Sequence, residues 1–370
     1  MRFTVDQSDF REALDRVAPA VPTKSPLPIL ANILLRLEGN TLQLVATDLE
    51  VSVVTELQVT GESDGSISVP AKKIGDIVRE LEGIPLVCTV DGGHHLTVEA
   101  GGGEYQVPGI SAQEFPALPE FDAAAKVSIE SAKLESMIGR TSFAVSRDEL
   151  RPALTGVFFQ IRPHEMRCVS TDGHRLVRII DQNFQAEGES RELIVPVKAL
   201  DMIRRNLPDE GTVEMMIGAS QFMIKLDKAT LYSRLIEGRY PHYESVIPSE
   251  NHNKLIVPVD ALISSVRRAQ IFANPINRQI VFKLTKDKLE ITAEDVELGG
   301  KGHETVEVEY EGEEQTIGYN AAYVLDLLRQ VTTDAVQFDL GGSTQAGIVR
   351  PTEQSAGEDF LMLIMPVRLS

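Results

Sequence analysis

Hydrophobic and polar residues alternate in the same way in three separate stretches of the chain. Each stretch holds an apolar run, a polar turn and a second apolar run that closes on an aspartate. Such alternation around a short turn predicts a β-hairpin with one buried face. The stretches are residues 33–48, 157–172 and 280–295, and they end at Asp48, Asp172 and Asp295.

The three stretches stand 124 and then 123 residues apart. A nearly constant spacing of this size indicates that one domain-sized unit is repeated three times. Two polar segments without periodicity, residues 117–126 and 247–254, separate the units. We therefore expect three domains, at residues 1–122, 123–249 and 250–370.

Each unit also shows two amphipathic helices at matching places. In one of them Ile74, Ile77 and Val78 recur at the spacing of a single helix face. The segments between the helices have the patterns of short strands. This combination predicts an α+β fold in which mostly antiparallel sheets carry helices on one face. The predicted helices cover residues 7–19, 70–81, 131–143, 196–207, 258–272 and 320–331.

The composition, 42% hydrophobic and 25% charged, is typical of a globular protein. No apolar run approaches the roughly 18 residues of a membrane span, and the first residues do not resemble a signal peptide. Cys88 and Cys168 lie in strand-like patterns, which favours buried reduced thiols over a disulfide or a metal pair. These observations predict a cytoplasmic protein.

The net charge of −19 argues at first against a polyanionic partner. The charge is unevenly distributed, however. The predicted helices hold 13 basic and 9 acidic residues, whereas the rest of the chain holds 23 and 46. A basic helical surface on an acidic protein would attract phosphates without reading bases. Ordinary solvated helix faces are the alternative interpretation of the same counts.

Catalytic motifs are weak in this sequence. Residues 61–65 match G-x-S-x-G, but they lie between two strand-like runs, which favours a hairpin turn over a nucleophile elbow. The sequence has no phosphate-binding loop, H-E-x-x-H or C-x-x-C motif. The repeated aspartates lie in different units, which favours a turn role over a metal or acid–base site. We expect no catalytic residue, metal or cofactor.

The densest polar cluster is Thr171-Asp172-Gly173-His174-Arg175, after the middle hairpin. A catalytic histidine is disfavoured because no serine or cysteine partner is identifiable. The cluster can form a structural turn in which Gly173 adopts a positive φ angle. It can equally form the rim of a surface that docks a peptide. The residues alone leave these two interpretations open.

Several longer motifs resemble one known family. They are LPILANILL (27–35), LVATDLEV (44–51), STDGHRL (170–176), EGRYPHYESVIP (237–248), IGYNAAYVLDLL (317–328) and MPVRL (365–369). Together with the threefold repeat they resemble the bacterial DNA polymerase III beta subunit, the sliding clamp. The resemblance covers the whole chain, and the motifs occur in the expected order.

The resemblance implies a head-to-tail homodimer in which six similar domains close a ring around double-stranded DNA. It further implies a DNA polymerase processivity factor that has no enzymatic activity and is placed on DNA by an ATP-driven clamp loader. The helices would line the hole and hold DNA by charge without sequence readout. The implied DNA-facing residues are Lys24, Arg79, Lys198, Arg204 and Arg205.

The family also has a hydrophobic groove that binds short peptides of the replicative polymerase, the clamp loader and other proteins. Met365 would adapt its shape to several such ligands. Ser245 replaces an arginine of the family's groove. The implied groove residues are Leu154, Thr171, Gly173, His174, Arg175, Leu176, Pro241, Val246, Asn320, Tyr323, Leu363, Met365, Pro366, Val367 and Arg368.

The implied dimer interface departs from the family in its charges. Relatives place basic residues where this chain has Glu104, and a mostly acidic run where residues 297–304 include Lys301 and His303. A swapped pair of Glu104 with Lys301 is our hypothesis. The apolar part of the interface would pair Ile271 and Phe272 with Ile74 and Ile77. The rival interpretation of the whole chain is a three-domain scaffold or carbohydrate-type enzyme unrelated to DNA.

Overall fold

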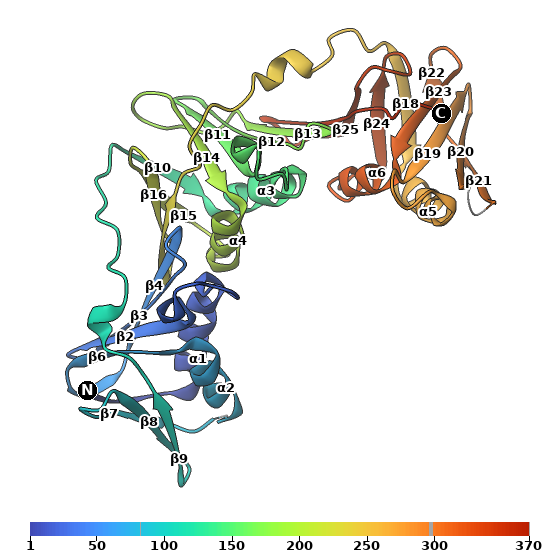
Figure 1. Ribbon diagram of the computed structural model, residues 1–370. Helices are drawn as coiled ribbons and strands as arrows, with labels where there is room; N and C mark the ends of the chain where they lie inside the picture. Colours follow the sequence, from blue (N-terminus) through green and yellow to red (C-terminus); the bar gives the residue numbers. More distant parts are fainter. Residues whose placement is uncertain (82, 296–298, 370) are drawn as a thin grey trace. The chain divides into compact units, whose positions relative to one another are not determined.

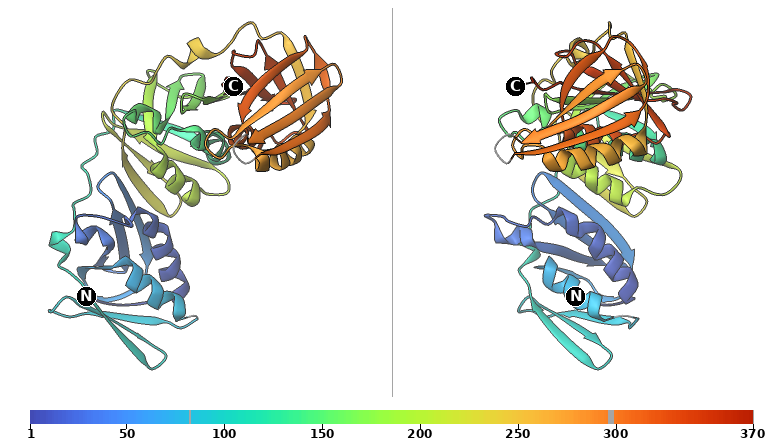
Figure 2. Two further views of the ribbon diagram at one scale, coloured as in Figure 1. Left: turned by 45° about the vertical axis from the view of Figure 1, so that its right-hand side comes forward. Right: turned by 90° about the vertical axis from the view of Figure 1, so that its right-hand side faces the viewer.

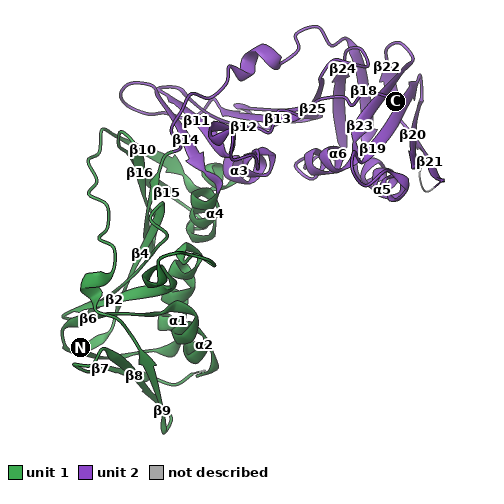
Figure 3. Ribbon diagram, viewed as in Figure 1, with its two compact units in different colours: residues 1–135, 198–235 green, residues 136–197, 236–370 purple. Residues whose placement is uncertain are grey.

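The computed structural model describes residues 1–81, 83–295 and 299–369. The contacts between residues divide the chain into two compact units, which Figure 3 distinguishes by colour. Unit 1 holds residues 1–135 and 198–235, and unit 2 holds residues 136–197 and 236–370.

The three predicted hairpins are present, and their turns lie at the predicted places (Figure 1). The hairpins share one register, because Leu35 pairs with Leu44, Phe159 with Cys168 and Phe282 with Ile291 at equivalent places. All six of these side chains are buried. The strands are β2 (Asn32–Glu38) with β3 (Thr41–Thr47), β11 (Gly156–Arg162) with β12 (Glu165–Thr171), and β19 (Gln279–Thr285) with β20 (Lys288–Asp295).

All six predicted helices are also present, and they end one to three residues before the predicted ends. Pro19 explains one early end, because proline cannot continue an α-helix beyond its first turn. Leu14, Val78 and Val324 lie in the buried faces, as the apolar spacing predicted. The helices are α1 (Gln7–Val17), α2 (Ala71–Glu80), α3 (Ser131–Thr141), α4 (Val197–Asn206), α5 (Val259–Ala269) and α6 (Ala321–Leu328).

Unit 1 contains two antiparallel sheets. One has the strand order β5-β1-β7-β8-β9, and the other has the order β10-β15-β16-β17-β4-β3-β2-β6. Helices α1 and α2 lie side by side, and α1 packs on β3 and β4 (Figure 2). The further strands are β1 (Arg2–Val5), β4 (Val51–Gln58), β5 (Thr60–Ser63), β6 (Gly65–Pro70), β7 (Leu86–Val90), β8 (His95–Ala100), β9 (Gly103–Pro108), β10 (Ala125–Glu130), β15 (Thr212–Ile217), β16 (Gln221–Lys225) and β17 (Ala229–Arg234).

Unit 2 has the same kind of construction. Its sheets have the orders β14-β11-β12-β13-β26-β25-β24-β18-β22 and β21-β20-β19-β23, both antiparallel. Helix α5 packs on β20 and β21 beside α6. The further strands are β13 (Arg175–Asp181), β14 (Arg191–Pro196), β18 (Asn253–Pro258), β21 (Gly300–Glu307), β22 (Glu309–Glu311), β23 (Gln315–Asn320), β24 (Ala335–Leu340), β25 (Gly347–Pro351) and β26 (Glu358–Ile364).

Each large sheet is built from two repeats. In unit 1 the strand after the first hairpin, β4, pairs with β17, the last strand of the second repeat. In unit 2 the strand after the second hairpin, β13, pairs with β26, the last strand of the third repeat. The strand after the third hairpin is β21, and the last strand of the first repeat is β9. Each of these two strands forms one edge of a sheet within the described parts of the chain.

The connecting segments cover both pairings with an aromatic residue followed by proline. Phe115, before Pro116, joins an apolar cluster with Leu34, Val45 and Val54 in unit 1. Tyr240 and Tyr243, beside Pro241, join a larger apolar cluster in unit 2. Tyr240 stacks on Phe158 with ring centroids 4.6 Å apart. Burial of aromatic surface at both places stabilises the pairing of the repeats.

Three further expectations can be compared with the fold. Cys88 and Cys168 are free, buried thiols, as predicted. The sequence at 61–65 is not a hairpin, because β5 and β6 belong to different sheets; it is a tight strand-to-strand corner at which Gly65 has φ +155°. Among the described helices, none is long and apolar enough to cross a bilayer.

Candidate functional site

The turn after β12 holds the cluster that the sequence singled out. The Asp172 carboxylate accepts the backbone N–H groups of His174 at 2.9 Å and Arg175 at 3.0 Å. The Thr171 hydroxyl donates to the Arg175 carbonyl at 2.6 Å and accepts the Gly173 N–H at 3.1 Å. Gly173 has φ +92°, which a residue with a Cβ adopts only at a cost. The predicted turn role of Asp172 is confirmed, and Gly173 has the positive φ angle of the turn interpretation.

The first repeat forms the same turn with one different residue. Asp48 accepts the N–H groups of Glu50 at 2.9 Å and Val51 at 2.7 Å, and Thr47 makes both equivalent hydroxyl contacts. Leu49 occupies the place of Gly173 and has φ +78°. Asp295 closes β20 in the third repeat, and residues 296–298 of that turn lie outside the described residues. A turn role for the aspartate is thus confirmed in the first two repeats.

Arg175 holds the second turn in place. Its side chain is only 9% exposed and forms ion pairs with Asp172 at 3.1 Å and Asp326 of α6 at 2.6 Å. The guanidinium also donates to the Phe143 carbonyl at 3.0 Å and lies 4.7 Å from the centre of the Tyr323 ring. A buried cation needs this much compensation, because its loss of water is costly. Arg175 therefore positions β13 against α6.

His174 projects differently from Arg175. Its ring stacks on Tyr323 with centroids 6.0 Å apart and an interplanar angle of 21°. Its carbonyl accepts the N–H of Met365 at 2.8 Å. No cluster of metal-ligating side chains is present among the described residues. These contacts join the turn to the C-terminal segment and place an aromatic surface beside it.

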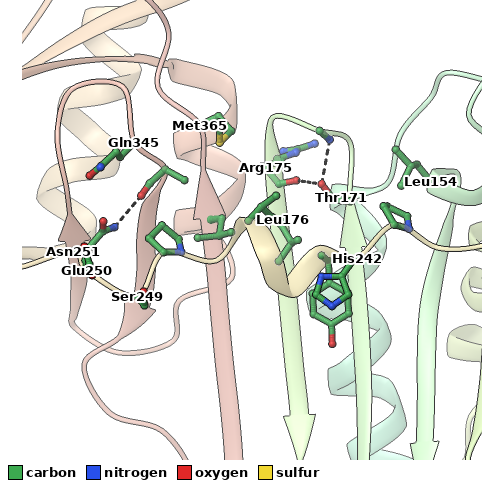
Figure 4. Close-up of a pocket in the computed structure, with 17 residues that line it drawn as sticks. Leu154, Thr171, Arg175, Leu176, His242, Ser249, Glu250, Asn251, Gln345 and Met365 are labelled. Atoms are coloured by element: carbon green, nitrogen blue, oxygen red, sulfur yellow. Dashed lines mark hydrogen bonds between the residues drawn. The ribbon is translucent and has the colours of Figure 1, made fainter.

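A cavity of about 630 Å³ opens next to this turn (Figure 4). Its lining includes nine of the residues that the resemblance implied. They come from the 3-10 turn before β11, from β12, β13 and the turn between them, from the connection between β17 and β18, and from β26 and the residue after it. The nine are Leu154, Thr171, Gly173, Arg175, Leu176, Pro241, Val246, Leu363 and Met365.

The floor of this cavity is apolar and fixed, whereas its rim is exposed. Leu176 pairs directly with Leu363 across β13 and β26, and both are buried in the apolar cluster of unit 2. At the rim Val246 is 54% exposed and Met365 is 41% exposed. A preformed apolar cavity with a soft methionine at its edge suits an apolar side chain of a ligand.

The other six implied groove residues lie beside the cavity rather than in its lining. Val367 donates its N–H to the Gly318 carbonyl at 2.8 Å, so the C-terminal segment runs along β23. Asn320 caps α6 by accepting the N–H of Ala322 at 2.9 Å. With the His174–Tyr323 stack, these residues continue the surface past Met365. The six are His174, Asn320, Tyr323, Pro366, Val367 and Arg368.

Sequence reasoning missed part of the lining. The missed residues belong to the segment that covers the strand pairing and to the connection between β24 and β25. The repeated aromatic-proline pair, Phe115-Pro116 and Tyr240-Pro241, was the signal that could have identified the covering segment. The missed residues are His242, Tyr243, Pro248, Ser249, Glu250, Asn251, Gln345 and Ala346.

The five implied DNA-facing residues all lie in unit 1 with exposed side chains. Arg79 of α2 is 3.4 Å from Asp76, Arg204 of α4 is 3.6 Å from Glu135, and Lys198 pairs with Asp48. Lys24 and Arg205 form no ion pair within the described part of the chain. The pairs of Arg79 and Arg204 are exposed and therefore weak, so these two cations can still attract an external anion.

The residues implied for the dimer interface differ in exposure. Ile271 is 74% exposed and Phe272 is 40% exposed, which is unusual for large apolar side chains. Glu104 and Lys301 are exposed on the edge strands β9 and β21. Ile77 is half-buried. Ile74 corrects the expectation, because it is fully buried in unit 1 and its side chain has no surface to offer a partner.

Comparison with known proteins identifies the family. Models of the N-terminal, central and C-terminal domains of the DNA polymerase III beta subunit match residues 1–119, 128–242 and 244–368. The beta sliding clamp of Pseudomonas putida is 32% identical over 372 residues and is covered completely, as is this chain.

Solved structures agree with this match. The sliding clamp of Pseudomonas aeruginosa with a ligand is 31% identical, with a TM-score of 0.94 and complete coverage of both chains. The clamp from the same organism bound to griselimycin gives the same identity, TM-score and coverage. The expected α+β fold of three clamp domains is confirmed. The chain belongs to the DNA polymerase III beta subunit family, a family of sliding clamps that act in DNA replication as non-enzymatic processivity factors.

Proposed function

We propose that two copies of this chain close head to tail into a ring that encircles duplex DNA and carries partner proteins by their peptides. The observation that carries this proposal is the repeated strand pairing. Two of the three junctions between consecutive repeats, β4 with β17 and β13 with β26, form within the chain. The third needs β21 and β9, each of which has a strand neighbour on one side only in the described parts of the chain. Edge strands invite pairing with another chain, and a ring of two copies would pair both of these edges.

The domain boundaries of this ring are proposed at the two connecting segments. Residues 117–124 and 247–252 are without strand or α-helix, and each precedes the first strand of a repeat. This supports domains at 1–122, 123–249 and 250–370. The two free buried thiols fit the reducing cytoplasm expected from the sequence.

The DNA contact is proposed to be electrostatic and independent of sequence. Lys24, Arg79, Lys198, Arg204 and Arg205 carry positive charge on exposed sites of a chain whose net charge is −19. Such contacts release counterions, so DNA retention should weaken steeply with salt. A diffuse contact of this kind allows sliding because no base is read.

The experiment for the ring is topological. The full chain is loaded onto nicked circular DNA with its clamp loader and ATP, and the complex is isolated by gel filtration. A ring stays on the circle and is lost once the DNA is cut to a linear form. Equal loss from both forms would contradict the ring.

In the triple variant Lys198→Ala, Arg204→Ala, Arg205→Ala, unchanged loading and unchanged salt dependence would contradict the DNA-facing assignment.

The cavity beside Thr171 is proposed as the site for peptides of the replicative polymerase, the clamp loader and other partners. A leucine or phenylalanine of the peptide would enter between Leu176, Leu363 and Val246, and the C-terminal segment would carry the rest of it. The relative bound to griselimycin supports a ligand-binding groove in this family.

The rim of this cavity offers a test that leaves the fold intact. Val246→Asp places a carboxylate at the apolar site, and Val246 is exposed enough to tolerate it. We expect at least about tenfold weaker binding of a fluorescent peptide with adjacent leucine and phenylalanine, since burying an unpaired charge is costly. Leu150→Asp, at an exposed residue outside the lining, is the matched control. Equal binding by both variants would place the peptide elsewhere.

A further inference from the structure

The internal junctions define which residues of β21 and β9 would face each other. In each repeat, the residue before the turn aspartate has a cross-strand partner on the following strand. These pairs are Thr47 with Ser52, Thr171 with Leu176, and Glu294 with Lys301. Ser52, Leu176 and Lys301 are therefore equivalent residues on β4, β13 and β21.

The other side of each junction can be matched in the same way. The first strand of each repeat has a basic residue five positions before the helix that follows it. These residues are Arg2 before α1, Lys126 before α3 and Lys254 before α5. Cross-strand pairing then leads from each of them to the last strand of its repeat. The three ladders are Arg2–Thr89–Thr97–Gln106, Lys126–Met216–Met223–Tyr232 and Lys254–Asp339–Ile348–Leu363.

The two sets of equivalent residues pair with each other in the junctions within the chain. Ser52 pairs with Tyr232, and Leu176 pairs with Leu363. By the same rule Lys301 faces Gln106 of a second copy. Because the strands are antiparallel, His303 then faces Glu104, and Gly302 faces Tyr105.

The side of this junction that carries Gly302 holds two exposed aromatic rings next to the ion pair of Glu304 with Arg268. A Cβ on Gly302 would lie 2.6 Å from the Phe272 ring, so the glycine is what allows that ring to lie on β21. Phe272 and Tyr105 are both large apolar residues with more than a third of their surface exposed. Opposing Gly302 with Tyr105 brings the two rings together, as aromatic side chains at interfaces commonly do.

The other side is charged, and its two edges are complementary. On β9, Glu104 stands directly opposite Glu99 of β8, and neither has an ion pair in the described residues. Like charges in this position destabilise a sheet. On β21, Lys301 and His303 share a face; Lys301 is 3.7 Å from Glu294, and His303 is 4.0 Å from Glu290.

We propose that His303 of one copy lies opposite Glu104 of the next, beside Lys301, and that protonation of His303 tightens the closure of the ring. This inference rests on the proposed dimer. Histidine is the side chain that commonly changes its charge between about pH 5 and 8. Protonated, His303 would stand between Glu290 and Glu294 on its own chain and Glu104 and Glu99 of the partner copy. A neutral His303 would leave Lys301 as the only cation of this strand beside Glu104 and Glu99 of the partner copy.

The remaining charges near His303 do not reverse this sign. Lys283 and Lys288 lie 3.7 Å and 3.1 Å from Glu290 and are thus already paired. Glu304 projects to the other side of β21, where it pairs with Arg268 at 2.6 Å. On β8, His95 lies 3.5 Å from its own Asp91, four residues from Glu99. The acids around His303 therefore outnumber the free cations.

The test measures the dimer dissociation constant of the full chain by analytical ultracentrifugation at about pH 6 and about pH 8. Each ring holds two junctions between copies, and one cross-strand pair changes each of them by roughly twofold. We therefore expect about fourfold tighter association at the lower pH. His303→Gln and Glu104→Gln should each remove this difference, whereas His95→Gln should keep it.

The outcomes separate the register, the switch and the ring. A dimer whose association does not depend on pH, or a pH dependence that survives in His303→Gln, overturns the switch but leaves the ring. A monomer at both pH values overturns both. For the register, Lys301→Cys with Gln106→Cys should form disulfides that link two chains. Lys301→Cys with Tyr105→Cys should not, because a shift of one residue turns the side chain to the other face. Equal linking by both pairs overturns the register.

Discussion

The most direct test of the turn beside the groove is Arg175→Ala. The substitution removes a cation whose side chain is 9% exposed and leaves Asp172 and Asp326 without it. Breaking a buried ion pair in this way costs about 3–5 kcal/mol. Two features of the site favour the lower value. Asp172 keeps its backbone N–H donors, and Asp326 is 31% exposed and retains Arg329 at 2.9 Å. We therefore expect a loss of about 3 kcal/mol in the free energy of unfolding of unit 2.

The assay is a urea titration followed by circular dichroism, together with a thermal scan. For a unit of this size, a loss of about 3 kcal/mol lowers the melting temperature by roughly 8 °C. Arg151→Ala is the control, because Arg151 forms an ion pair of 2.9 Å with Asp148 in which both side chains are 40% or more exposed. An exposed pair of this kind should cost less than about 1 kcal/mol. If Arg175→Ala destabilises unit 2 no more than Arg151→Ala does, the account of Arg175 as a buried clamp is refuted.

Three further predictions follow from the turns, the thiols and the C-terminal segment. Leu49→Gly should stabilise unit 1 by about 0.5 kcal/mol, because relief of the positive φ angle exceeds the entropy cost of glycine. Gly173→Ala should destabilise unit 2 for the converse reason. Calorimetry of the two variants measures both changes in stability. Burial raises the pKa of Cys88 to about 12 and that of Cys168 well above its usual value. The protonated thiols therefore contribute fully to the free energy of unfolding below about pH 9, and this contribution falls by about 1.4 kcal/mol per thiol for each pH unit above that value. Unfolding measured at alkaline pH, with Cys→Ala variants as controls, can detect the loss. Truncation after Met365 should abolish binding of the leucine–phenylalanine peptide with little change in the melting temperature, and retained binding would argue against the role of Val367 and its neighbours.

Membership of the sliding clamp family excludes the rival interpretation of a scaffold or carbohydrate enzyme unrelated to DNA. The strained turn at Leu49 can be compared with the equivalent turn at Gly173. The first and second repeats fold the same Thr-Asp turn, yet only the second places Gly173, His174 and Arg175 beside an apolar cavity. In the first repeat the equivalent aspartate pairs with Lys198 instead. One structural device thus serves two different surfaces.

The sequence by itself determined the hairpins, the helices and the threefold repeat. Alternation around Gly39-Asn40, Pro163-His164 and Lys286-Asp287 is a local signal, because successive side chains of a strand point to opposite faces. The stripe of Leu14, Val78 and Val324 is likewise local, since it follows from the helical period. The resemblance added nine residues of the cavity lining, seven of which lie within the motifs at 170–176, 237–248 and 365–369.

Only the tertiary structure decided the rest, because strand pairing and burial depend on residues far apart in the chain. The direct pairing of Leu176 with Leu363 forms the groove floor, and no local pattern contains it. The helical period placed Ile74 and Ile77 on one face, but packing buried Ile74 completely and left Ile77 half-buried. The same dependence on distant partners assigns His303, rather than Lys301, as the proposed direct partner of Glu104, since cross-strand register is set by the sheet and not by the sequence of either edge.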